Sequence, residues 1–157
     1  MKAEEFMIGD WVLGLVEDNE EIGKIIAKHP ARIIKIEENG DYAAQCPYTF
    51  DEMYEGDGTL IEDFLWYDTE PMPLTAEILS KNGFVSKKGF MQKGNFGDGP
   101  LMIWHTEDNK ILRHFTHELE ISDLSSDKGY RIRFICNYVH QLQHALRLCG
   151  INKEIVL

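Results

Sequence analysis

The stretch from residue 138 to residue 149 constrains the fold most, because its apolar residues recur at three- and four-residue steps. That spacing predicts a short amphipathic helix with one apolar stripe. The stripe consists of Val139, Leu142, Leu146 and Cys149. A strand-like run at 130–135 precedes the helix, and the apolar run at 155–157 predicts a terminal strand after it. The rest of the chain must supply the surface that the stripe covers.

A second short helix is predicted over residues 75–82. Thr75 is a natural N-cap, because its side-chain oxygen can accept a hydrogen bond from a backbone N–H of the first turn. Gly83 is expected to end this helix in the left-handed conformation, with Phe84 folding back as in a Schellman motif. Gly150 is expected to end the helix over 138–149 in the same way.

The remaining apolar segments are short and β-like, so the sequence predicts an α+β fold with two parts. Residues 1–70 are predicted to form a small SH3-like β-barrel with an acidic, aromatic loop. In that part the β-branched runs 22–27 and 31–36 are expected to be separate strands, since Pro30 cannot sit in a central strand. Residues 71–157 are predicted to form an antiparallel sheet covered by the two helices.

The net charge is −11, and the acidic residues are concentrated between Glu37 and Glu77, where no Lys or Arg occurs. Such a segment repels phosphate, so direct nucleic-acid binding is not expected. The stretch is either a solvated face that keeps the protein soluble or a surface for a basic protein partner. The candidate partner-binding residues are Asp51, Glu52, Glu55, Asp57, Trp66 and Tyr67.

Two other patterns are consistent with ligands. Residues 85–99 combine lysines and glycines with two phenylalanines, which suits either single-stranded nucleic acid or a flexible hairpin. Residues 51–62 have the length of a calcium loop, but Met53 occupies a ligand position and cannot bind a hard cation. We therefore expect no cofactor.

His140 and His144 lie four residues apart on the second helix and are weak candidates for a metal pair. The zinc-peptidase pattern needs a Glu directly after the first His, but Gln141 occupies this position and cannot accept a proton. The alternative is an exposed polar face of the helix, away from the apolar stripe. The sequence offers no catalytic residue.

Three segments carry a resemblance to a known group. They are Ile8-Gly9-Asp10-Trp11-Val12, then the run Pro71-Met-Pro-Leu-Thr-Ala-Glu-Ile-Leu-Ser-Lys-Asn-Gly-Phe84, and Tyr138-Val-His-Gln-Leu-Gln143. Together they resemble a family of small uncharacterised bacterial and prophage proteins of gut anaerobes. Met72 departs from the family's usual Ile, and His144 stands where Asn is common. The resemblance implies a shared fold and a mobile-element context, and it carries no catalytic residues.

The predicted function is a non-enzymatic interaction or accessory protein that binds a protein partner. The alternatives are an acidic nucleic-acid mimic that acts on a DNA-handling protein, and a metal-dependent enzyme that uses His140 and His144. The N-terminal residues lack a signal-peptide pattern, and no apolar run approaches the roughly 20 residues of a membrane span, so we expect a cytoplasmic protein without membrane contact. Cys136 and Cys149 lie among apolar residues and are expected to be buried free thiols.

Overall fold

The structure is a computed structural model. It describes residues 6–17, 21, 23–36, 38, 41–45, 65–66, 69–87, 101–115, 117–123 and 130–157. Its contacts divide the chain into a first unit, Met1–Met72, and a second unit, Pro73–Leu157. The predicted α+β class is confirmed, since the described part of the chain has two antiparallel sheets and two helices. Neither helix of the described part is long and apolar enough to cross a membrane.

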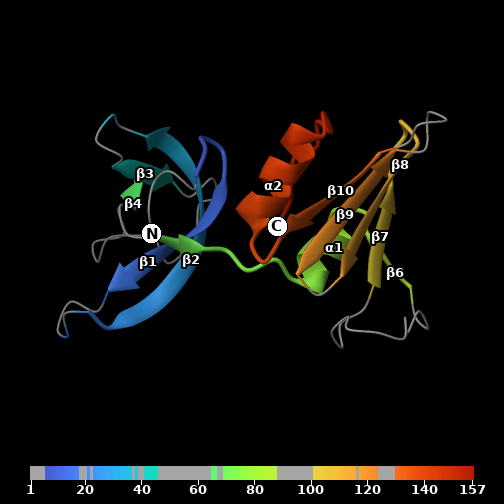
Figure 1. Ribbon diagram of the computed structural model, residues 1–157. Helices are drawn as coiled ribbons and strands as arrows, with labels where there is room; N and C mark the ends of the chain where they lie inside the picture. Colours follow the sequence, from blue (N-terminus) through green and yellow to red (C-terminus); the bar gives the residue numbers. More distant parts are fainter. Residues whose placement is uncertain are drawn as a thin grey trace. The chain divides into compact units, whose positions relative to one another are not determined.

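The first unit is a five-stranded antiparallel sheet (Figure 1). Its strands are β1 (Trp11–Glu17), β2 (Ile25–Ile36), β3 (Tyr42–Gln45), β4 (Leu65–Trp66) and β5 (Thr69–Pro71), in the order β4-β3-β2-β1-β5. The sheet is curled, because the Tyr42 hydroxyl of β3 lies 2.8 Å from the Thr69 Oγ1 of β5, although β2 and β1 lie between these strands in the sheet order. Among the described residues the edge strands β4 and β5 do not pair, so the predicted closed barrel is not confirmed.

Strand β2 corrects the prediction that Pro30 separates two strands, since one strand runs through it. The N–H of Ile33 bonds to the carbonyl of Asp10. From this pair on, residue pairs between β2 and β1 alternate between hydrogen-bonded and non-hydrogen-bonded. Pro30 thus faces Leu13 as a pair without hydrogen bonds, and its nitrogen points away from β1. Among the described residues, β2 pairs with β3 only from Arg32 onward, so no described strand needs an N–H from Pro30 on that side.

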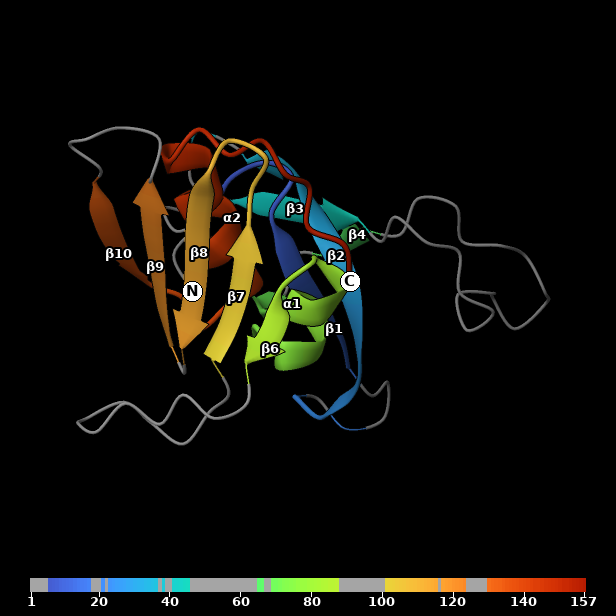
Figure 2. The ribbon, with the colours of Figure 1, turned by 90° about the vertical axis from the view of Figure 1, so that its right-hand side faces the viewer.

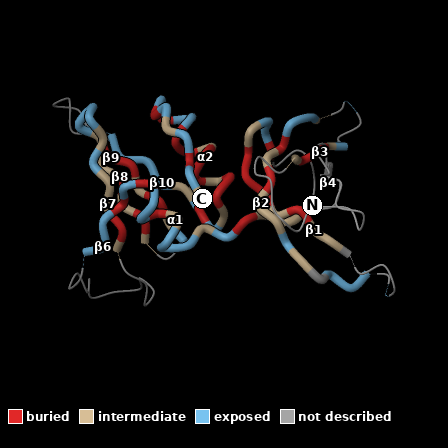
Figure 3. Tube along the Cα trace, turned by 180° about the vertical axis from the view of Figure 1, so that it is seen from behind, coloured by how far each residue is buried: buried red, intermediate tan, exposed pale blue. Residues whose placement is uncertain are grey.

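The second unit is another five-stranded antiparallel sheet, with both helices on one face (Figures 1 and 2). Its strands are β6 (Val85–Lys87), β7 (Leu101–His105), β8 (Lys110–Phe115), β9 (Glu118–Asp123) and β10 (Arg131–Ile135), in the order β10-β9-β8-β7-β6. The helices are α1 (Ala76–Lys81) and α2 (Val139–Leu148). Buried residues predominate along α2 (Figure 3), where Val139, Leu142 and Leu146 are at most 1% exposed.

The predicted caps of both helices are confirmed. Thr75 Oγ1 accepts the N–H of Ile78, 3.3 Å away. After α1, Gly83 has φ +87° and the N–H of Phe84 bonds to the carbonyl of Leu79 at 3.0 Å. After α2, Gly150 has φ +66° and Ile151 makes the equivalent bond to Leu146 at 2.9 Å. These are Schellman endings, which need the left-handed conformation that glycine adopts without strain.

The predicted terminal strand at 155–157 is wrong, because residues 151–157 form no strand. The side chain of Asn82, only 2% exposed, fixes this segment instead. Asn82 Nδ2 donates to the carbonyl of Val156 at 2.7 Å, and its Oδ1 accepts the N–H of Val156 at 2.9 Å. This amide takes the place of a neighbouring strand and holds Ile155 fully buried.

Candidate functional site

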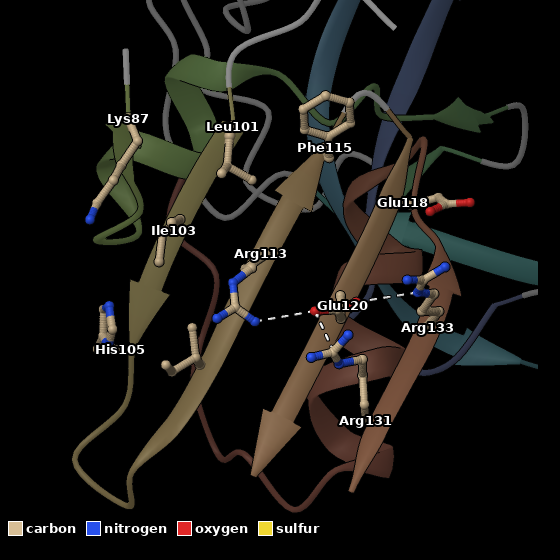
Figure 4. Close-up of a pocket in the computed structure, with 11 residues that line it drawn as sticks. Lys87, Leu101, Ile103, His105, Arg113, Phe115, Glu118, Glu120, Arg131 and Arg133 are labelled. Carbon is tan, nitrogen blue, oxygen red and sulfur yellow. Dashed lines mark hydrogen bonds and ion pairs between the residues drawn. The ribbon is translucent and has the colours of Figure 1, made fainter. Parts of the chain in front are cut away.

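The outer face of the second sheet, opposite α1 and α2, holds a hollow of about 480 Å³. Successive side chains of a strand point to opposite faces of the sheet. Every second residue therefore packs under the helices, and the residues between them line this face. Figure 4 shows the lining side chains in front of the sheet and the helices behind it. The lining residues are Lys87, Leu101, Ile103, His105, Ile111, Arg113, Phe115, Glu118, Glu120, Arg131 and Arg133.

Three arginines of the outer face converge on one carboxylate, Glu120 (Figure 4). Arg113 of β8 and Arg133 of β10 are both in register with Glu120 of β9, so they flank it directly. Arg113 Nη1 lies 3.2 Å from Glu120 Oε1, and Arg133 Nε lies 3.3 Å from Oε2. Arg131 Nε approaches Oε1 diagonally at 3.5 Å. We call these four residues the arginine cluster.

The arginine cluster has more positive charge than its carboxylate can balance. Arg131 and Arg133 reach Glu120 through Nε, and their side chains are 62% and 57% exposed. No contact among the described residues uses their Nη groups. The described lining residues comprise four cations and two carboxylates, a net +2 in a protein of net charge −11. Guanidinium groups with open Nη atoms suit a planar anion such as a carboxylate, which they bind through two parallel hydrogen bonds.

The other half of the outer face is apolar. Leu101 and Ile103 of β7, with Ile111 and Phe115 of β8, line the hollow beside the arginine cluster. The described lining residues include no serine, threonine or cysteine, although the Ser122 hydroxyl of β9 lies on the same face, 3.3 Å from Arg113 Nη1. The chemistry of this face fits binding of a ligand that is anionic on one side and apolar on the other.

A signal for this face is present in the sequence. Glu118 and Glu120 are two residues apart in one segment, and Arg131 and Arg133 are two residues apart in the next. In adjacent antiparallel strands this spacing places opposite charges on one face. The position of Arg113 opposite Glu120 depends on the register of β8, which the sequence does not specify.

The acidic partner-binding candidates are not part of this site. Asp51, Glu52, Glu55, Asp57 and Tyr67 lie outside the described residues, as does the calcium-like segment 51–62. For Trp66 the structure gives only the backbone, in β4. Of the lysine- and glycine-rich segment 85–99, Val85–Lys87 forms β6, and the remainder lies outside the described residues.

The interpretation of His140 and His144 as an exposed polar face is wrong for His140, which is 3% exposed. Its ring stacks on Tyr138 at 5.8 Å and meets the ring of His144 edge-on at the same distance. Gln141 has a structural role, since its Oε1 accepts the N–H groups of Asn137 and Tyr138 at the start of α2. In the described part of the chain, no group of three His, Cys, Asp or Glu side chains is placed to hold a metal ion.

His114 and Cys136 lie under the sheet and face the core. Burial lowers the pKa of His114, and its Nε2 lies 3.1 Å from the carbonyl of Cys136, which accepts a hydrogen bond from the neutral ring. Burial raises the pKa of Cys136 to about 12, so this group is a thiol at neutral pH. Cys136 and Cys149 are both free and buried, which confirms that prediction.

We expect His114 to make folding stability fall as the pH drops below about 6.5, the usual histidine pKa. The folded-state pKa is lowered, so between these two values the unfolded chain binds more protons and protonation favours unfolding. For one proton the slope is at most about 1.4 kcal/mol per pH unit. His114→Gln lacks this contribution, so the stability difference from wild type should shrink between pH 7.5 and pH 5 in urea titrations. An unchanged difference would show that His114 titrates normally.

The chain was compared with protein-family models, curated proteins and solved structures, and none of the three comparisons gave a match.

Proposed function

We propose that the chain is a non-enzymatic binding protein whose partner is another protein, held on the outer face of the second sheet through an acidic, partly apolar segment. The observation that carries this proposal is a hollow lined on one side by the arginine cluster and on the other by apolar side chains, on a face that neither helix covers. The open Nη groups of Arg131 and Arg133 supply charge-assisted hydrogen bonds to carboxylates. Leu101, Ile103 and Phe115 supply apolar contact area.

A protein segment fits this face better than a nucleic acid does. Single-stranded nucleic acids are held mainly by stacking on several aromatic rings, and the described lining residues include one phenylalanine, Phe115, and no tyrosine or tryptophan. The net charge of −11 repels a phosphate backbone over a distance of several ångströms. A short acidic segment with apolar residues carries less charge and can use both halves of the hollow.

The test is selection from a displayed random-peptide library on purified protein. Wild type should enrich peptides that combine Asp or Glu with apolar residues, and their affinity should weaken steeply as salt rises. The double variant Arg131→Glu, Arg133→Glu should lose at least tenfold in affinity for the selected peptides. The matched control is Lys81→Glu, Arg147→Glu, which changes the net charge equally at two exposed helix positions and should bind like wild type.

Equal affinity of the two double variants would overturn the proposal, as would tighter binding of an unstructured oligonucleotide than of the selected peptides. Enrichment of Lys- and Arg-rich peptides would instead favour the acidic segment between Glu37 and Glu77 as the binding surface. That outcome would support the basic partner predicted from the sequence, or the nucleic-acid mimic. Most of that segment lies outside the described residues.

We also propose that the first unit is a bent, incompletely closed sheet of the SH3-like kind. Two observations support this. The strand order β4-β3-β2-β1-β5 places the last strand beside the first, and the contact between Tyr42 and Thr69 joins strands that are not neighbours in this order. Barrels of this kind often host binding, which is compatible with an accessory role.

A further inference from the structure

Strand β10, Arg131–Ile135, is an edge of the second sheet, because its only strand neighbour among the described residues is β9. The register shows which of its backbone groups are used. The N–H of Asp123 bonds to the carbonyl of Tyr130, and the N–H of Cys136 bonds to the carbonyl of His117. In an antiparallel pair of strands every second residue pair is hydrogen-bonded. Ile132 and Phe134 therefore also direct their backbone N–H and C=O groups to β9.

The backbone N–H and C=O groups of Arg131, Arg133 and Ile135 therefore point away from the sheet. No hydrogen bond among the described residues uses them. The side chains of Arg131 and Arg133 belong to the outer face. Backbone groups that can bind a further strand and side chains that can bind its carboxylates thus come from the same two residues.

Strand β10 lacks two of the usual protections of an edge, a proline and a bulge, and its charged residues are the two arginines. It contains no proline, and its pairing with β9 runs over five residues without a bulge. Ile132 is 41% exposed and Ile135 is 56% exposed, so apolar area remains open along it. The opposite edge, β6, has three described residues, Val85–Lys87.

The two arginines of β10 determine which kind of strand can pair with its free edge. If two copies paired through β10 in antiparallel fashion with Arg133 at the centre, Arg133 would face Arg133. If they paired around Ile132, Arg131 would face Arg133. Like charges directly opposite each other destabilise a sheet, so both of these self-paired arrangements are disfavoured. A strand with carboxylates at alternate positions complements Arg131 and Arg133, and its apolar residues then lie on the side of Ile132 and Phe134.

We propose that β10 takes up an extended acidic segment of a partner protein as a sixth strand of the second sheet. This inference rests on the proposed function and specifies how the partner is held. Backbone hydrogen bonds to the three outward-facing residues of β10 position the segment, and carboxylates on Arg131 and Arg133 select it.

The test uses an eight-residue peptide of alternating Glu and Val, capped at both ends, with isotopically labelled full-length protein. At saturation, amide hydrogen exchange at Arg131, Arg133 and Ile135 should slow at least tenfold. Exchange at Ile132 and Phe134 should change little, because β9 already binds their amides. A peptide with Lys in place of Glu is the charge control and should not bind.

Two further peptides separate strand addition from simple charge attraction, because alternate residues of a strand direct their N–H groups to opposite sides. One peptide is N-methylated at every Glu, the other at every Val. Strand addition predicts that one loses binding at least tenfold and the other keeps most of it. If the peptide methylated at Glu loses binding, the added strand is antiparallel to β10. If the peptide methylated at Val loses binding, the added strand is parallel to β10.

Equal binding of both methylated peptides and the parent peptide would overturn strand addition. If all three peptides bound equally well to wild type but not to the variant Arg131→Glu, Arg133→Glu, binding through the arginines would be supported. The proposed function would then stand, without strand addition. A further outcome is that the library yields acidic peptides that bind while the parent peptide does not bind. That result would overturn strand addition and leave the proposed function intact. Slow exchange at Arg131 and Arg133 that appears without peptide and grows with protein concentration would assign the edge to a second copy.

Discussion

Leu142→Ala is expected to lower the free energy of unfolding of the second unit by about 2–5 kcal/mol. Leu142 is fully buried on the inner side of α2, in the apolar stripe that the sequence predicts. The truncation removes transfer free energy and leaves a cavity that the neighbouring side chains fill only in part. Because both helices belong to the second unit, urea unfolding followed by far-UV circular dichroism at the helical band reports on it.

Leu148→Ala is the matched control, since the same atoms are removed from the same helix. Leu148 is 76% exposed at the last position of α2. Its truncation should change stability by no more than about 0.5 kcal/mol. Similar losses for both variants would mean that α2 does not pack through the Val139–Leu142–Leu146 stripe.

The sequence predicts the helices of this protein better than its strands, because helix signals are local. The three- and four-residue spacing and the caps at Thr75, Gly83 and Gly150 lie within a few residues of the structure that they specify. Strand signals depend on partners far along the chain. Pro30 illustrates this, since its effect depends on where β3 stops pairing with β2, which only the register reveals.

The terminal run at 155–157 failed as a strand for a related reason. Its apolar composition correctly predicts burial of Ile155, but no neighbouring strand among the described residues supplies hydrogen bonds to it. The partner is a side chain, Asn82, which is 74 residues away from Val156 in sequence. Nothing in the sequence around residue 155 indicates such a partner.

The candidate site follows the same rule. The alternation of Glu118 with Glu120 and of Arg131 with Arg133 is readable, whereas the third arginine, Arg113, depends on the pairing of β8. The pattern His140-x-x-x-His144 suggests a metal because histidines are conspicuous in sequence. In the structure His140 is buried on the ring of Tyr138, so helix periodicity alone misjudged which faces of α2 are covered.

Asn82→Asp is expected to destabilise the second unit at neutral pH by about 3 kcal/mol, more than Asn82→Ala. The amide nitrogen of Asn82 lies 2.8 Å from the carbonyl of Ile78 and 2.7 Å from that of Val156. A carboxylate there has no proton to donate, so two acceptor oxygens would face a buried negative charge. Alanine loses the hydrogen bonds without adding that repulsion and should cost less, about 1–2 kcal/mol.

The pH dependence distinguishes this account from general disruption of the fold. Facing carbonyl oxygens in a buried site, the carboxyl group that Asn82→Asp introduces would have a folded-state pKa above the usual value of about 3.9. The folded variant then binds more protons than the unfolded chain, so its stability relative to wild type should recover as the pH falls from 7 towards 4. The loss of stability in Asn82→Ala does not depend on a titrating group, so it should stay constant with pH.

Asn152→Asp, at an exposed position nearby, controls for the added charge and should remain close to wild type throughout. A deficit of Asn82→Asp that does not shrink at low pH would show that the side chain of residue 82 does not donate to Val156.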